Sequence, residues 1–123
     1  MPKRSNLFQK VVYLTKKAAA SNAKVEESRF LVDRVTGKKR EVDVCVETNL
    51  HGHTIILGIE CRDTKRAASV EWVEQHKAKH ERLDTNLLVL MSRSGFSSEA
   101  LKLAKLSGIE ALSLESINQE SVA

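Results

Sequence analysis

Two carboxylates stand in stretches where β-strands usually carry apolar side chains. Asp43 lies between Val42 and Val44, and Glu60 directly follows the apolar run 55–59. Ionised carboxylates are seldom placed in such runs without a partner, because burying the charge is costly. Two acids on neighbouring strands would make a site for a divalent cation. The residue types therefore point to metal-dependent chemistry.

The segment between the two acids is short and polar and contains a glycine, which is typical of a turn between antiparallel strands. A turn centred on His51 and Gly52 places Asp43 opposite Glu60, with Cβ atoms roughly 4.5–5.5 Å apart. Because side chains alternate along a strand, we expect an apolar core face made of Val42, Val44, Val46, Ile55, Leu57, Ile59 and Cys61. The other face would carry Glu41, Asp43, Cys45, Glu47, Ile56, Gly58, Glu60 and Arg62.

Carboxylates this close repel one another unless a positive charge offsets them. Mg²⁺ suits the pair, because it prefers oxygen ligands and often uses one or two carboxylates together with a substrate phosphate. Arg62 lies two residues beyond Glu60 on the same face, where it would neutralise the pair or hold a phosphate oxygen. The alternative is a partly buried ion-pair network of Asp43, Glu60 and Arg62 without further function.

The elements that must position these residues follow from periodicity and capping residues. The pattern predicts helices over about 6–21, 69–83 and 97–106, and strands over about 25–35, 41–47, 55–62, 86–91 and 109–114. Ser5 and Ser69 are the expected N-caps of the first two helices, and Gly108 is expected to end the third. The order αβββαβαβ predicts an α/β fold, with a mixed sheet flanked by helices on both faces.

Length and composition agree with one soluble domain over 1–123, with a loose tail from about residue 115. No apolar run approaches the roughly 20 residues that span a bilayer. The N-terminus lacks the long apolar stretch of a secretory signal. Cys45 and Cys61 are expected on opposite faces and therefore unbonded. These features favour a cytoplasmic protein without a membrane partner.

The net charge of +4 and the pI near 9.2 favour a polyanionic partner. Aromatic residues make up only 4% of the chain, whereas single-strand binders rely on aromatic stacking platforms. Duplex or branched DNA is therefore the expected partner. The candidate DNA-binding residues are Lys38, Lys39, Arg40, Lys65 and Arg66.

Three segments carry a family resemblance: Arg40-Glu41-Val42-Asp43-Val44, Ile59-Glu60-Cys61-Arg62-Asp63, and Gly95-Phe96-Ser97-Ser98-Glu99-Ala100. On the strength of these segments and the order of elements, nearly the whole chain resembles a restriction-endonuclease-like domain of the PD-(D/E)xK superfamily, closest to its Mrr-type branch. The resemblance implies Mg²⁺-dependent hydrolysis of DNA phosphodiester bonds, with Mn²⁺ able to substitute. A homodimer would suit the cutting of both strands of a duplex.

The same resemblance implies that Asp43, Glu60 and the backbone carbonyl of Cys61 hold the metal. The family's lysine position is occupied by Arg62, which stays protonated and cannot act as a general base. Gln9 stands where many relatives have an acid in the first helix, although an exposed helix residue is the commoner interpretation. Two alternatives therefore remain, a DNA-binding module of the same fold with weak or no cleavage and a Holliday-junction-type resolvase.

Other candidates point less clearly to chemistry. His51 and His53 flank a glycine and are expected to be exposed turn residues, since no third zinc ligand is apparent. His76 and His80 share a helix face, which we interpret as a polar or DNA-facing surface. Gln75 is a possible accessory residue on the same helix, with an exposed glutamine as the favoured alternative. Cys45 has no activating base beside it.

Overall fold

The structure is a computed structural model, and it describes residues 7–19 and 22–113. Its elements are α1 (Leu7–Ala19), β1 (Lys24–Val32), β2 (Lys39–Leu50), β3 (His53–Arg62), α2 (Val70–His80), β4 (Leu87–Ser92), α3 (Ser98–Leu106) and β5 (Glu110–Ser113). The predicted order of helices and strands is confirmed. None of the helices in this part of the chain has the length and apolar character that a membrane crossing requires.

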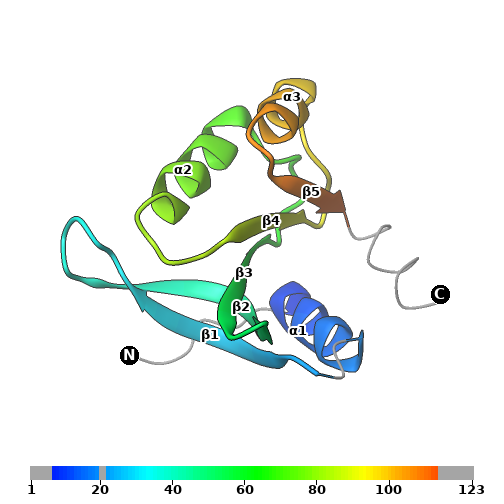
Figure 1. Ribbon diagram of the computed structural model, residues 1–123. Helices are drawn as coiled ribbons and strands as arrows, with labels where there is room; N and C mark the ends of the chain where they lie inside the picture. Colours follow the sequence, from blue (N-terminus) through cyan, green and yellow to red (C-terminus); the bar gives the residue numbers. More distant parts are fainter. Residues whose placement is uncertain (1–6, 20–21, 114–123) are drawn as a thin grey trace.

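The five strands form one mixed sheet in the order β1-β2-β3-β4-β5 (Figure 1). β1, β2 and β3 are antiparallel, whereas β3, β4 and β5 are parallel, because α2 and α3 return the chain to the same end of the sheet. His51 and Gly52 form the β2–β3 turn, both with positive φ, and Val44 pairs with Ile59. The predicted register of this hairpin is therefore confirmed.

Helices cover both faces of the sheet, as predicted (Figure 1). α1 packs through Phe8 and Val12 on one face, against Val44, Ile59, Cys61, Val89 and Met91. On the other face, α2 and α3 contribute Val73, Ala100 and Ala104 to a cluster with Leu88, Leu90 and Ile109. Cys45 and Cys61 lie in different clusters and are not bonded, as expected.

One assignment from strand alternation is wrong. Val42 does not pack with Val44 but belongs to a third cluster with Cys45, Ile56 and Leu83. Ser28 lies between the pairs Glu27–Val44 and Arg29–Val42 and has a φ of 56°, which changes the backbone direction of β1 at this point. The local change in backbone direction places Val42 in a different cluster from the one that alternation predicts.

The predicted caps Ser69 and Gly108 are confirmed. Ser69 accepts a hydrogen bond from the backbone N–H of Trp72 at the start of α2, and at the start of α3 Ser97 accepts one from the backbone N–H of Ala100. Gly108 follows α3 with a φ of 69°. Ser5 and the tail from residue 115 lie outside the described residues.

The first strand and the second helix both end about three residues earlier than predicted. β1 stops at Val32 because Asp33 opens a turn, in which its carboxylate accepts the backbone N–H groups of Val35 and Thr36. α2 stops at His80, which leaves Leu83 free to pack in the third cluster. Short polar side chains that bond their own backbone compete with regular structure in this way.

Asp33 also ties the β1–β2 turn to the end of α2. Its side chain is fully buried and accepts hydrogen bonds from the guanidinium groups of Arg40 and Arg82. Burial raises the pKa of Asp33, but the backbone bonds of Thr36 and Val35 and the two arginines outweigh it and lower the pKa to about 2.

Candidate metal centre between β2, β3 and α2

The two predicted acids lie where β2 and β3 stop pairing through their backbones. The ladder ends at the pair Val44 and Ile59, and beyond it the carboxylates bridge the strands. Asp43 Oδ2 accepts the backbone N–H of Cys61 at 2.8 Å, and Glu60 Oε1 accepts the backbone N–H of Asp43 at 3.4 Å. Both acids are buried, with 3% and 1% of the residue exposed. The two strands therefore bring Asp43 and Glu60 together, as the register predicts.

Helix α2 supplies three basic side chains to Glu60. Glu60 Oε2 lies 2.7 Å from Lys79 Nζ, 2.7 Å from His80 Nε2 and 3.6 Å from His76 Nδ1. Positions 76, 79 and 80 share one helix face, because residues three and four apart are neighbours on a helix. One oxygen of Glu60 thus faces α2, while the other faces β2.

The electrostatics of this site keep Glu60 ionised. Burial alone would raise its pKa, but the imidazoles of His76 and His80 and the ammonium of Lys79 outweigh that effect and hold the pKa below its usual range. Lys79 already supplies a positive charge beside this carboxylate, so a cation bound at Glu60 would have to displace the ammonium or lie on the side that faces Asp43. Carboxylates are ligands that a divalent cation uses, and the two strands supply two of them.

His80 is held in place by two further contacts. Its Nδ1 lies 2.9 Å from Thr85 Oγ1, and its ring packs against the backbone of Gly58 on β3. A Cβ at Gly58 would lie 2.8 Å from His80 Cε1, so a larger residue at this position would displace the ring. His76 is held by Trp72, whose ring meets it edge-on with centroids 4.7 Å apart.

Gln9 supports the site from α1. It is fully buried, and its Nε2 donates to the backbone carbonyl of Asp43 at 3.1 Å and to Ser28 Oγ at 3.2 Å. The interpretation of Gln9 as an exposed helix residue is therefore wrong. Its amide lies against the backbone of Asp43 and helps to fix that acid.

Arg62 is not placed against Glu60. Its guanidinium lies over the ring of Trp72, 6.0 Å from the centroid, and its Nε is buried without a hydrogen-bond partner among the described residues. Lys79 holds the position beside Glu60 that the sequence suggested for Arg62. Cys61 reaches the site through its backbone N–H, which donates to Asp43.

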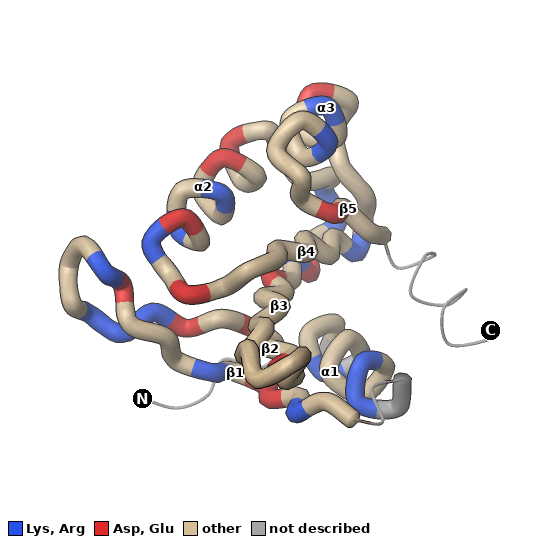
Figure 2. The backbone as a smooth tube through the Cα atoms, viewed as in Figure 1, with Lys and Arg blue, Asp and Glu red and all other residues tan. Residues whose placement is uncertain are grey.

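The remaining candidates lie around α2. Lys38 is exposed on the β1–β2 turn and Lys39 at the start of β2, and Figure 2 shows this turn beside the end of α2. Lys65 and Arg66 are exposed in the loop just before α2. The two basic groups therefore flank a helix of 11 residues, about 16 Å long. Gln75 is exposed on α2, as the favoured interpretation held.

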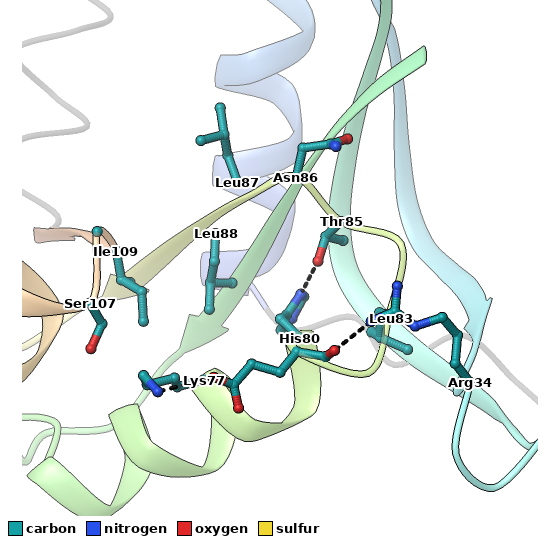
Figure 3. A pocket seen from close by; sticks show the side chains of 12 residues that line it. Arg34, Lys77, His80, Leu83, Thr85, Asn86, Leu87, Leu88, Ser107 and Ile109 are labelled. Atoms are coloured by element: carbon teal, nitrogen blue, oxygen red, sulfur yellow. Dashed lines mark hydrogen bonds and ion pairs between the residues drawn. The ribbon is translucent and has the colours of Figure 1, made fainter. Parts of the chain in front are cut away.

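A cavity of about 350 Å³ opens next to the site, between the end of α2, the start of β4 and the turn before β5 (Figure 3). His80 lines it together with Lys77, Thr85 and Leu88. The ring of His80 therefore lies between this cavity and Glu60.

The sequence interpretation missed the role of α2. His80 is buried against Glu60, so its assignment to a polar or DNA-facing surface is wrong, whereas His76 is partly buried beside the same carboxylate. Lys79 was not singled out. A sequence signal for these contacts exists, because positions 76, 79 and 80 carry three basic residues at helical spacing. Gly58 on β3 has no side chain, which leaves room for the ring of His80. His51 and His53 are exposed turn residues, as expected.

Comparison with known proteins places the fold. No family model matches the sequence, and no curated protein does. A protein of unknown function, AF1548, is 16% identical with a TM-score of 0.69 over 88% of this chain. The MspJI restriction endonuclease, in complex with a 27-mer oligonucleotide, is 14% identical with a TM-score of 0.58 over 94%. The DNA modification-dependent restriction endonuclease AspBHI is 9% identical with a TM-score of 0.56 over 96%.

The chain has a restriction-endonuclease-like fold. It spans 58%, 27% and 36% of the lengths of AF1548, MspJI and AspBHI respectively. This fold agrees with the mixed five-stranded sheet and the helices on both of its faces. Among the described residues, Glu60, His76 and His80 form a group that could hold a metal ion.

Proposed function

We propose that this protein is a metal-dependent DNA endonuclease whose centre is formed by Asp43 and Glu60. The observation that carries the proposal is the pair of buried carboxylates that bridge two parting strands beside an internal ammonium group. Burying two ionised acids costs free energy, and buried acids with shifted pKa values are frequent at functional sites. The order of elements and the Gly95-Phe96-Ser97 segment support the Mrr-type branch as the nearest family.

Asp43, Glu60 and the carbonyl of Cys61 would hold Mg²⁺ or Mn²⁺. When bound, such a cation polarises a phosphate and lowers the pKa of a coordinated water. Gln9 fixes the backbone of Asp43 from the opposite face of the sheet. Lys79, rather than Arg62, has its charge beside Glu60, and we assign it the orienting role that a lysine has in relatives.

DNA is the proposed substrate because the chain is basic and one protein with the same fold, MspJI, has been solved with an oligonucleotide. The basic groups at the two ends of α2 would bind phosphates on either side of the centre, chiefly through Lys38, Lys39, Arg40, Lys65 and Arg66. Arg40 also binds Asp33, so its contribution to DNA affinity should be smaller than that of Lys38 or Lys39.

The test is incubation of supercoiled plasmid with Mg²⁺ or Mn²⁺, against EDTA. We expect metal-dependent cleavage by the native protein and none by Asp43→Asn, which keeps the side-chain shape. Glu47→Gln is the matched control, because this acid lies on the same strand but pairs with Arg29 away from the centre. Equal cleavage by native protein and Asp43→Asn would rule out this centre.

The second candidate is a DNA-binding module without cleavage. It is favoured by one observation, namely that Lys79 already neutralises Glu60 inside the protein. In that case the native protein would bind a labelled duplex with an affinity that falls steeply with salt, and neither Mg²⁺ nor Mn²⁺ would yield product.

A further inference from the structure

The side of Glu60 that faces α2 carries a set of metal-ligating atoms separate from Asp43. Glu60 Oε2, one imidazole nitrogen of His76 and one of His80 all lie within 4.8 Å of one another. The two nitrogens nearest Glu60 are His80 Nε2 at 2.7 Å and His76 Nδ1 at 3.6 Å. The opposite oxygen of Glu60 is engaged with the backbone of Asp43. A single carboxylate therefore faces two different environments.

Two of the three separations are close to those of a small tetrahedral site. Ligands at 2.0–2.1 Å from a tetrahedral Zn²⁺ lie roughly 3.3 Å from one another. The separations of 2.7 Å between Glu60 and His80 and 3.6 Å between Glu60 and His76 fall on either side of this value, and the two imidazole nitrogens lie within 4.8 Å of one another. His76 Nδ1 is buried and has no hydrogen-bond partner among the described residues, which leaves this nitrogen available to an ion.

The surroundings also supply what a metal-binding histidine needs. Such a histidine usually donates its other ring N–H to a neighbouring acceptor, which fixes its orientation. His80 has this partner in Thr85 Oγ1, 2.9 Å from its Nδ1, and the absence of a side chain at Gly58 gives its ring room. The edge of Trp72 holds His76. Both rings are therefore fixed before any ion arrives.

We propose that Glu60, His76 and His80 form a second cation site, on the α2 side of Glu60, for a transition metal such as Zn²⁺ or Co²⁺. Two imidazoles and one carboxylate suit these ions, whereas Mg²⁺ prefers oxygen ligands alone. The site goes beyond the proposed nuclease centre and does not depend on it, because binding of the ion can occur without cleavage.

Lys79 is the competitor for this site. Its ammonium lies 2.7 Å from Glu60 Oε2, the same oxygen that would bind the metal. An ion bound there must displace this ammonium or bear its repulsion, and either effect weakens binding. Removing the charge of Lys79 should therefore tighten metal binding, an effect that a purely structural role for the three ligands would not produce.

The experiment is a titration of the full chain with Co²⁺ in the absence of DNA, followed by visible absorption, with Zn²⁺ and Mg²⁺ as competitors. We expect one Co²⁺ per chain, displaced by equimolar Zn²⁺ but not by millimolar Mg²⁺. His76→Gln should weaken binding about tenfold or more, since loss of even an outer partner of a metal ligand costs about 10–100-fold. Lys79→Met should tighten it about tenfold or more.

His53→Gln is the matched control, because this histidine is exposed at the start of β3 and its loss should leave the titration unchanged. Equal binding by His76→Gln and native protein, or loss of binding in His53→Gln alone, would overturn the site. Weaker binding by Lys79→Met would also overturn it. Since no DNA is present, failure of cleavage leaves these results unaffected, and loss of the Co²⁺ signal leaves the plasmid assay unaffected.

Discussion

The ion pair between Lys79 and Glu60 gives a stability prediction whose size follows from its burial. The two charged atoms are 2.7 Å apart, and the side chains are 12% and 2% exposed. Removing one partner of a buried pair leaves the other charge uncompensated and costs about 3–5 kcal/mol. His80 and the backbone N–H of Asp43 still bond to Glu60 in Lys79→Met, so we expect the lower end, about 3 kcal/mol.

The assay is urea denaturation of native protein and Lys79→Met, followed by circular dichroism. A loss of about 3 kcal/mol would lower the melting temperature of a chain of this size by about 10 °C. Lys77→Met is the control, because this lysine lies on the same helix, is 40% exposed and pairs with the exposed Glu81. A surface pair of this kind contributes about 0.5 kcal/mol or less.

A double variant isolates the pair. Once Glu60→Gln has removed the negative charge, Lys79→Met should cost much less than it does alone, because no carboxylate is left to compensate. Two results would refute the reasoning: equal losses in Lys79→Met and Lys77→Met, or fully additive losses in the double variant.

Two further predictions concern residues around the site. Gly58→Ala should lower the free energy of unfolding by about 1–3 kcal/mol, since its Cβ would lie 2.8 Å from His80 Cε1. In a His80→Ala background, urea denaturation should show a smaller loss, and an equal loss in both backgrounds would contradict the clash. Asp33 has its pKa lowered from 3.8 to about 2, so its contribution to stability is complete above about pH 4 and is lost as the pH falls toward 2. Asp33→Asn should therefore flatten the fall in stability between pH 4 and pH 2, and an unchanged slope in denaturation curves would exclude Asp33 as its source.

The sequence was sufficient to predict the register of the β2–β3 hairpin but not how α2 packs on it. Apolar and polar residues alternate around Asp43, and a one-residue slip would bury charges in the core, so the placement of Asp43 beside Glu60 was predictable. The contacts of Lys79, His76 and His80 depend on how α2 is rotated over the sheet, which packing of Val73 and the small Gly58 decides.

Two other differences have local causes. Gln9 is buried although glutamine is usually exposed, because the backbone carbonyl of Asp43 and Ser28 Oγ satisfy its amide. Val42 changes cluster because Ser28 takes a positive φ that few residues other than glycine adopt. Neither a buried amide with its partners nor an isolated left-handed serine leaves a periodic pattern in the sequence.

The carboxylates of Asp43 and Glu60 replace the backbone ladder where β2 and β3 part, each accepting an N–H group of the facing strand. The same two side chains therefore hold the strands together whether or not they take part in chemistry. A descendant of this protein that had lost all enzymatic activity would still be under selection to keep both acids. The presence of both acids in a homologue would indicate the same fold. Whether that homologue is an active enzyme would have to be judged from the residues that surround the two acids.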